Sequence, residues 1–230
     1  MLMLLRQLFD SGSSTYSYLI ADPVTGEAAL VDPVLEQIDR DLGLVSALDL
    51  HVTYVLETHI HADHVTAASE IRARTGARIA RGASDAPCVD VPLEHGDFIH
   101  VGSLVVTALA TPGHTNDGFS YRAPGHVLTG DTLLIGGCGR SDFQNGDAGE
   151  LYDSITRVLY RLPDDTVVLP GHDYKGFTAS TIGEEKKHNA RVAGRSRDEF
   201  IALMAELRLP PPRLLDLAVP ANRACGRMGG

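Results

Sequence analysis

A short stretch of the chain, residues 57–69, reads ETHIHADHVTAAS and carries three histidines and an aspartate within six positions. Imidazole nitrogens and carboxylate oxygens bind zinc and iron in proteins. The preceding residues are typical of a strand, in which side chains two positions apart point to the same side. We therefore expect His59, His61 and Asp63 to converge as the strand runs into a loop, with His64 facing a second point. The spacing predicts a metal site and leaves open the metal, the number of ions and the reaction.

Three further candidate ligands lie far along the chain, each in a glycine turn after an apolar strand. They are His114 in TPGHT, Asp131 in LTGDT and His172 in LPGHD. Glycine permits close approach of the backbone, and loops at strand ends are free to aim side chains. We expect these strand ends to meet the first cluster in one pocket. The remaining histidines are interpreted as solvated or hydrogen-bonded residues: His51, His95, His100, His126 and His188.

The cysteines, Cys88, Cys138 and Cys225, are few and odd in number for a chain of 230 residues. None has the spacing of a closed zinc site, which favours thiolates. The set argues against a disulfide framework and for a reducing compartment. The apolar start, MLMLLRQLF, is too short for a secretory signal and is interrupted by Arg6. We therefore expect a first strand there and a cytoplasmic protein.

The chain is acidic, with a net charge of −10 and a pI of about 5.4. Such a charge repels phosphate backbones, so nucleic acid is not expected as a partner. No apolar run is long enough to cross a membrane, so no membrane partner is expected either. An anionic substrate would require a local basic pocket that works against the overall field.

Apolar residues at alternating or continuous spacing predict strands, and those at helical spacing predict helices. Strands are expected within residues 1–9, 7–22, 27–33, 52–59, 77–81, 98–113, 119–134 and 166–172. Helices are expected within residues 35–48, 62–76, 149–163, 180–190 and 197–209. The Pro-rich tail, residues 210–230, is expected to be irregular.

This order of elements predicts an α+β fold in a single domain, residues 1–230, with two sheets packed face to face and helices outside. The alternative is a doubly wound parallel sheet. Many of the predicted strands follow one another without an intervening helix, which argues against that alternative.

The motifs THIHADH, TPGHT, TGDT and PGHD occur in this order and resemble those of the metallo-β-lactamase superfamily over almost the entire chain. The resemblance implies an αββα sandwich of two mixed sheets with metals at one edge. For a dinuclear site it implies one metal at His59, His61 and His114, a second at Asp63, His64 and His172, and Asp131 as a bridge.

Two branches of this superfamily with thiol-derived substrates are similar to the chain. The segments LLIGGCGRSDFQNG, GHDYKGFTASTIGEEKKHNARV and LDLAVPANRACG resemble those of persulfide dioxygenases. The alternative is a glyoxalase II-like hydrolase of S-lactoylglutathione with two zinc ions. Glyoxalase II normally has a larger helical C-terminal region, whereas only about sixty residues follow His172 here.

The persulfide dioxygenase resemblance implies one Fe(II) held by His59, His114 and Asp131, the two-histidine, one-carboxylate arrangement of non-haem iron oxygenases. Glutathione persulfide, O2 and water would be converted to sulfite and glutathione. The residues that would support the ligands, or hold a second metal in the alternative, are His61, Asp63, His64, His172 and Asp173.

Four residues in the loops after the ligands are candidates for substrate binding: Arg140, Tyr174, Lys175 and Cys138. Arg140 offers a guanidinium fork for a carboxylate of glutathione. Lys175 is either a second such contact or a solvent-facing charge, and Cys138 is either a reactive thiol or a small buried residue. A homodimer paired through the N-terminal strand is compatible with the sequence.

The chain also departs from the family pattern beside the ligands. Ala67 or Ala68 stands where a glycine is common, and Asn116 and Asp117 stand where a Pro-Gly pair is common. These departures leave the ligands intact and put the local loop geometry in question.

Overall fold

Two mixed six-stranded sheets form the centre of the protein in a computed structural model that describes residues 2–82 and 86–227. The first sheet has the order β1 (Leu4–Asp10), β2 (Thr15–Ala21), β3 (Glu27–Val31), β4 (His51–Glu57), β5 (Arg78–Gly82) and β6 (Val91–Leu93). The second has the order β12 (Ser180–Thr181), β11 (Val167–Pro170), β10 (His126–Gly130), β9 (Phe119–Ala123), β8 (Leu104–Ala110) and β7 (Phe98–Val101).

Both sheets mix parallel and antiparallel pairs. In the first sheet β1, β2 and β3 are antiparallel, and β3 to β6 are parallel. In the second sheet β10 and β11 are parallel and the other neighbours are antiparallel. The predicted hairpin succession is therefore present in both halves, together with the helix crossovers that parallel pairs need.

The core between the sheets follows from the alternation of side chains along the strands. Tyr18 and Ile20 of β2 pack with Tyr121 and Leu128 of the second sheet in one buried cluster. Leu19, between the first two, points to the opposite face and packs in a second cluster with helix residues. Each such fully buried aliphatic side chain contributes about 1.5–3 kcal/mol to folding.

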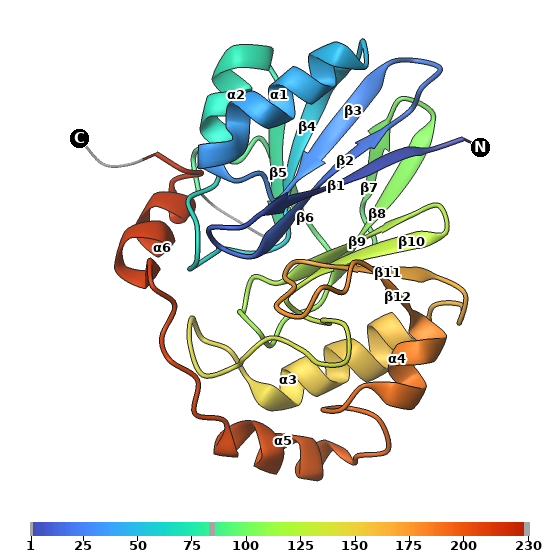
Figure 1. Cartoon of the computed structure of the whole chain (residues 1–230), viewed down its shortest axis with the longest axis vertical. Coiled ribbons are helices and arrows are strands. Elements are labelled where there is room, and N and C mark those ends of the chain that lie inside the picture. Colours follow the sequence, from blue (N-terminus) through green and yellow to red (C-terminus); the bar gives the residue numbers. More distant parts are fainter. Residues whose placement is uncertain (1, 83–85, 228–230) are drawn as a thin grey trace.

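Helices cover the two outer faces, as Figure 1 shows. The first sheet is covered by α1 (Ile38–Ala47) and α2 (Ala68–Thr75), and the second by α3 (Ala148–Asp153), α4 (Ile182–His188) and α5 (Arg197–Glu206). A π-helical turn (Ser154–Val158) and 3-10 turns (Leu35–Gln37, Leu159–Arg161) extend this set. The predicted αββα sandwich is confirmed.

Several element boundaries differ from the prediction. The helix expected within residues 62–76 begins at Ala68, because the residues before it form the loop that carries the candidate ligands. The short strands β6 and β12 were not predicted, since three or two residues give no recognisable pattern.

The tail is not wholly irregular, which corrects the prediction for residues 210–230. It contains α6 (Leu215–Arg223), with Pro220 inside the helix. Ala218 and Ala221 of this helix are buried against Val65, which follows the candidate ligand loop. This packing stabilises a helix that the proline content disguised. No helix in the described residues is long and apolar enough to span a membrane.

The sequence argued against a disulfide framework, but the cysteines do form one disulfide. Cys88, between β5 and β6, is bonded to Cys225, just beyond α6, and the two are 137 positions apart in sequence. A single pair at such separation has no local spacing signature, so only the fold brings the two thiols together. Cys138 is the free cysteine and is buried.

Loss of this disulfide should destabilise the protein substantially. A cross-link that closes a loop of 137 residues removes chain entropy worth about 4–5 kcal/mol from the unfolded state. We expect Cys225→Ser to lower the melting temperature by about 10–15 °C for a chain of this size. The measurement is thermal unfolding followed by circular dichroism, with and without dithiothreitol. The Cys138→Ser control should still respond to the reductant, and equal melting curves for oxidised and reduced wild type would contradict the assignment.

Candidate metal centre

The predicted ligands meet at one edge of the sandwich, in the loops that follow β4, β8, β10 and β11. The ligand atoms of His59, His114 and Asp131 lie within 4.8 Å of one another. The rings of His59 and His114 are edge to face with centroids 4.9 Å apart, and His114 Nε2 is 3.5 Å from Asp131 Oδ2. Two imidazoles and one carboxylate from three separate loops therefore surround one point.

The tautomer of His59 is fixed by a chain of hydrogen bonds. The Thr58 hydroxyl donates its proton to Asp32 Oδ2 at 2.8 Å. His59 Nδ1 lies 2.9 Å from the same hydroxyl oxygen and must therefore be the donor. This leaves the lone pair of His59 on Nε2, where a metal would need it. Burial, together with the charge of His61, holds the pKa of His59 well below its usual range, so the ring is neutral.

His114 is oriented in the same way by the backbone. Its Nδ1 is 2.6 Å from the carbonyl oxygen of Arg140. A carbonyl only accepts hydrogen bonds, so His114 carries its proton on Nδ1 and its lone pair on Nε2. Both histidines of the cluster thus present a metal-binding nitrogen, and the donor set fits a divalent transition metal.

Asp131 provides the negative charge of the cluster. Its Oδ1 accepts a hydrogen bond from His172 Nδ1 at 2.6 Å. Burial alone would raise the pKa of Asp131, but the charge and hydrogen bond of His172 hold it well below its usual range. Asp131 is therefore a carboxylate, with Oδ2 on the side of His114.

His172 has no free nitrogen for a metal in this arrangement. Its Nδ1 faces Asp131, and its Nε2 is 3.0 Å from Asp63 Oδ2. Burial alone would lower the pKa of His172, but the two carboxylates raise it well above its usual value. Thr15 completes the group by donating to Asp63 Oδ2 at 2.9 Å. His172 and Asp63 thus form an ion-paired support behind Asp131.

His61, Asp63 and His64 form a second group whose ligand atoms lie within 4.8 Å. His64 Nδ1 is 2.8 Å from Asp63 Oδ2. His61 Nε2 lies 3.1 Å from Asp32 Oδ1 and 3.5 Å from Glu57 Oε2, on the buried side of the loop. The structure therefore brings the ligand atoms of His59, His114 and Asp131, the set expected for a single iron, within 4.8 Å of one another. The His61 ring also lies near His59, with centroids 4.1 Å apart.

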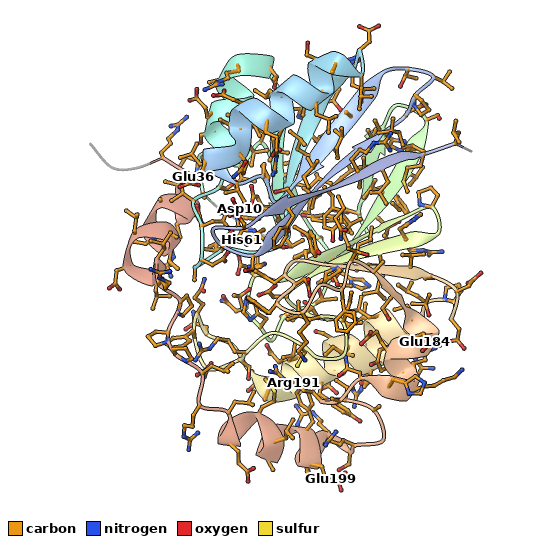
Figure 2. The ribbon with its side chains drawn as sticks, viewed as in Figure 1. Asp10, Glu36, His61, Glu184, Arg191 and Glu199 are labelled. Carbon is orange, nitrogen blue, oxygen red and sulfur yellow. A yellow bond between two sulfur atoms is a disulfide. The ribbon has the colours of Figure 1, made fainter. Side chains whose placement is uncertain are left out.

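A C-terminal asparagine that sequence reasoning did not single out holds the loop with these ligands. Asn222 of α6 donates from Nδ2 to the carbonyls of His61 and His64 at 2.9 and 2.8 Å. Its Oδ1 accepts from the backbone N–H of Thr66 at 2.9 Å. The motif LDLAVPANRACG pointed to this segment, but a side-chain amide contact to distant backbone has no sequence signal. Figure 2 shows His61 in the loop that α6 holds.

The unusual residues after His114 also support the loop. Asp117 Oδ2 accepts from the backbone N–H of Ile60 at 3.0 Å. Gln144 Nε2 donates to the carbonyl of the same residue, Ile60, at 2.7 Å. The departure at Asp117 therefore supplies a hydrogen bond between two ligand loops.

A cavity of about 600 Å³ opens beside His59, His114 and Asp131. This volume is in the range of small-molecule sites. Its walls are formed by the loops after β10 and β11, by the end of α4 and by the C-terminal segment before α6. The apolar part of the wall consists of Leu134, Ile135, Phe143, Phe177, Leu209, Pro210 and Pro212.

Arg140 lines this cavity, but its guanidinium is engaged by the protein. Nε and Nη2 donate to the two carboxylate oxygens of Asp142 at 2.6 and 2.7 Å. Nη1 and Nη2 also donate to the carbonyls of Pro210 and Leu209 at 2.6 and 3.2 Å. Arg140 therefore ties the C-terminal segment to the wall of the cavity.

The other predicted substrate contacts after His172 lie in one turn. Tyr174 stacks on the His172 ring with centroids 5.8 Å apart and is exposed at the cavity. Asp173, predicted as a supporting residue, accepts from the backbone N–H groups of Lys175 and Gly176 at 2.9 and 2.6 Å, so it shapes the turn, and it also lines the cavity. Lys175 lines the cavity, is exposed, and has no ion pair in the described part of the chain.

Close packing around the ligands makes Gly139 irreplaceable. A Cβ at this position would lie 2.5 Å from the Asp131 carbonyl oxygen and 2.7 Å from His114 Nδ1. We expect Gly139→Ala to displace His114 and to weaken metal binding by about tenfold or more, while the fold is retained. Metal titration and far-ultraviolet circular dichroism measure the two effects. Gly43→Ala is the matched control, since a Cβ there meets nothing within 4 Å; equal metal affinity of both variants would refute this account.

Cys138 should behave as a packed thiol. It is 2 % exposed, and burial raises its pKa to about 11, against the lowering effect of Arg191. Because the thiolate is the nucleophile, iodoacetamide should label native protein slowly at pH 8, and the rate should rise about tenfold per pH unit up to the pKa. Denaturation without reductant should expose one thiol. Rapid labelling of the native protein near pH 7 would instead identify a reactive cysteine at the cavity.

The model of the metallo-beta-lactamase superfamily matches residues 10–87 and 84–172 of the chain. The crystal structure of ETHE1 from Myxococcus xanthus is 59% identical in sequence, superposes with a TM-score of 0.96, and covers 97% of this chain and 100% of its own. Human mitochondrial persulfide dioxygenase ETHE1 is 42% identical over 227 residues, which are 97% of this chain and 89% of the human one.

The hydroxyacylglutathione hydrolase of Cereibacter sphaeroides is also related, but over a smaller part. It is 36% identical over an alignment of 177 positions, which covers 73% of this chain and 66% of the hydrolase. The similarity to the persulfide dioxygenases, in contrast, extends through the C-terminal segment that contains α6. The chain belongs to the metallo-β-lactamase superfamily and, within it, to the family of persulfide dioxygenases.

Proposed function

We propose that this chain is an Fe(II)-dependent persulfide dioxygenase that converts glutathione persulfide, O2 and water to glutathione and sulfite. The observation that carries the proposal is the set of His59, His114 and Asp131 beside a cavity of about 600 Å³. Two imidazoles, each held by a hydrogen bond at Nδ1, and one carboxylate match the donors that non-haem iron oxygenases use. The near full-length similarity to the persulfide dioxygenases supports the same activity.

We propose one iron per chain. The hydrogen bonds of His172 to Asp131 and Asp63 support this number, because both of its nitrogens are used as donors. The position of His61, beside the Asp32 and Glu57 carboxylates, supports it too. The alternative is a hydrolase with two zinc ions, which would require His172 to give up one of its two carboxylate partners.

When bound, iron supplies the redox chemistry for reaction with O2 that no amino-acid side chain provides. The chain itself orients the ligands through Thr58 and the Arg140 carbonyl, and keeps Asp131 ionised through His172. The apolar cavity wall excludes bulk water from the persulfide and holds it close to the ligands. Tyr174, at the mouth, offers an aromatic surface to the substrate.

Three wider expectations stay predictions. We propose a single domain, which the shared buried cluster between the two sheets supports. A homodimer through β1 is compatible with the place of that strand at the edge of its sheet. The third expectation is a cytoplasmic location. Two observations do not favour it: the protein has a disulfide, which is typical of oxidising compartments, and its mammalian relatives are named as mitochondrial.

The proposal is tested by O2 uptake with iron-loaded protein and glutathione persulfide. We expect uptake coupled to sulfite formation and one iron per chain. His114→Ala should lose iron, and its activity should fall at least about 100-fold. The reason is that loss of a metal ligand reduces activity more than loss of a group that orients a ligand. His126→Ala is the control, since this histidine lies at the other end of β10 from Asp131.

The same preparation also tests the alternative. Hydrolysis of S-lactoylglutathione without O2 uptake, together with two zinc ions per chain, would assign the protein to the hydrolases. Retention of iron and full turnover by His114→Ala would overturn the ligand assignment.

A further inference from the structure

Two arginines line the cavity, and the protein uses them differently. The Arg140 guanidinium makes four hydrogen bonds to Asp142, Leu209 and Pro210, and it lies 4.2 Å above the ring of Phe143. A guanidinium has five N–H donors, so one is left over. Arg140 has a carboxylate partner of its own and therefore little left for a ligand.

Arg191, just beyond α4, has no carboxylate partner in the described residues, unlike Arg140. Its Nη1 donates to the carbonyl oxygen of Cys138. Within the described residues its Nε and Nη2 have no hydrogen-bond partner, and the side chain has no ion pair although it is half-buried at the cavity wall. A cation that is partly removed from water without a counter-ion is unfavourable unless an anion arrives.

The support beneath Arg191 is rigid. Asn189 Oδ1 accepts from the Arg191 backbone N–H at 3.1 Å, and Asn189 Nδ2 donates to Gly137 O and Glu185 Oε2 at 2.9 and 2.7 Å. Glu185 in turn accepts from the backbone N–H of Gly136 at 3.0 Å. These buried bonds fix the end of α4 to the loop after β10, so Arg191 is held in place before any ligand binds. Arg191 is labelled in Figure 2, near α3 and above α5 in this view.

The distance from Arg191 to the ligands suits a small peptide. An added Cβ at Gly139 would meet His114 Nδ1 at 2.7 Å, and one at Gly137 would meet Arg191 Nε at 3.9 Å. Two residues of chain span at most about 7 Å, so with these two contacts and two Cα–Cβ bonds Arg191 Nε lies within about 17 Å of His114 Nδ1. In glutathione the sulfur is on the central residue and a carboxylate ends each arm, so a sulfur beside the ligands and a carboxylate at Arg191 fit within this limit.

We propose that Arg191, and not Arg140, binds a carboxylate of the peptidyl persulfide, and that Arg140 instead positions the C-terminal segment that closes the cavity. This inference rests on the proposed function for the identity of the substrate. Arg191 is then a specificity-determining residue. Its open Nε and Nη2 donors form the planar fork that matches a carboxylate with two hydrogen bonds.

Arg191→Gln is the informative variant, because it keeps a polar side chain at the cavity wall while the charge and the fork are lost. On iron-loaded protein we expect a 10- to 100-fold rise in KM for glutathione persulfide, with kcat and iron content unchanged. The KM for 2-mercaptoethanol persulfide, which has no carboxylate, should not change. Arg191→Lys should restore part of the loss, and Arg208→Gln, an exposed arginine at the end of α5, should match wild type.

Calorimetric titration with reduced glutathione, without O2, separates this inference from the proposed function. If wild type binds glutathione and Arg191→Gln binds it 10- to 100-fold more weakly, the carboxylate site holds even if no persulfide is oxidised. Equal glutathione affinity of both proteins, or no binding to wild type, would overturn it. Equal losses for both persulfides together with lost iron would show that Arg191 only shapes the loop.

Discussion

The hydrogen bond from His114 to the carbonyl of Arg140 is the contact on which the site depends. It fixes the metal-binding nitrogen of His114, and it forces the glycine loop after Asp131 to pass directly against the ring. The side chain of the same Arg140 holds Leu209 and Pro210 at the cavity. One residue therefore couples the geometry of the metal ligands to the closure of the substrate cavity, through backbone on one side and guanidinium on the other.

The C-terminal segment completes a site that the two sheets only begin. The backbone of the irregular loop after β4 has no strand or helix to supply its hydrogen bonds, and the side chain of Asn222 supplies them instead. Leu209 and Pro210 form part of the cavity wall. A superfamily scaffold can vary its chemistry with such additions because the strands that carry the ligands do not have to change.

The sequence predicted the fold, and it predicted that the candidate ligands meet at one edge, because both leave repeated local patterns. Apolar alternation predicted the sandwich, and glycine turns after strands predicted where His114, Asp131 and His172 lie. Long-range pairs left no such pattern. The bond of Cys88 to Cys225, the amide contacts of Asn222 and the hydrogen bonds of Arg140 to Leu209 and Pro210 depend on which distant groups the fold brings together. The roles of Arg140 and Arg191 follow from such long-range contacts and leave no pattern in the sequence.

The disulfide makes residues 88–225 a covalent ring. His114, Asp131 and His172 belong to this ring, whereas His59 lies outside it on the N-terminal part of the first sheet. A metal at the site would therefore act as a second link between the ring and the rest of the chain. The two sheets are then held by one buried apolar interface and one coordinate link across their edge, so metal release and separation of the sheets become coupled events.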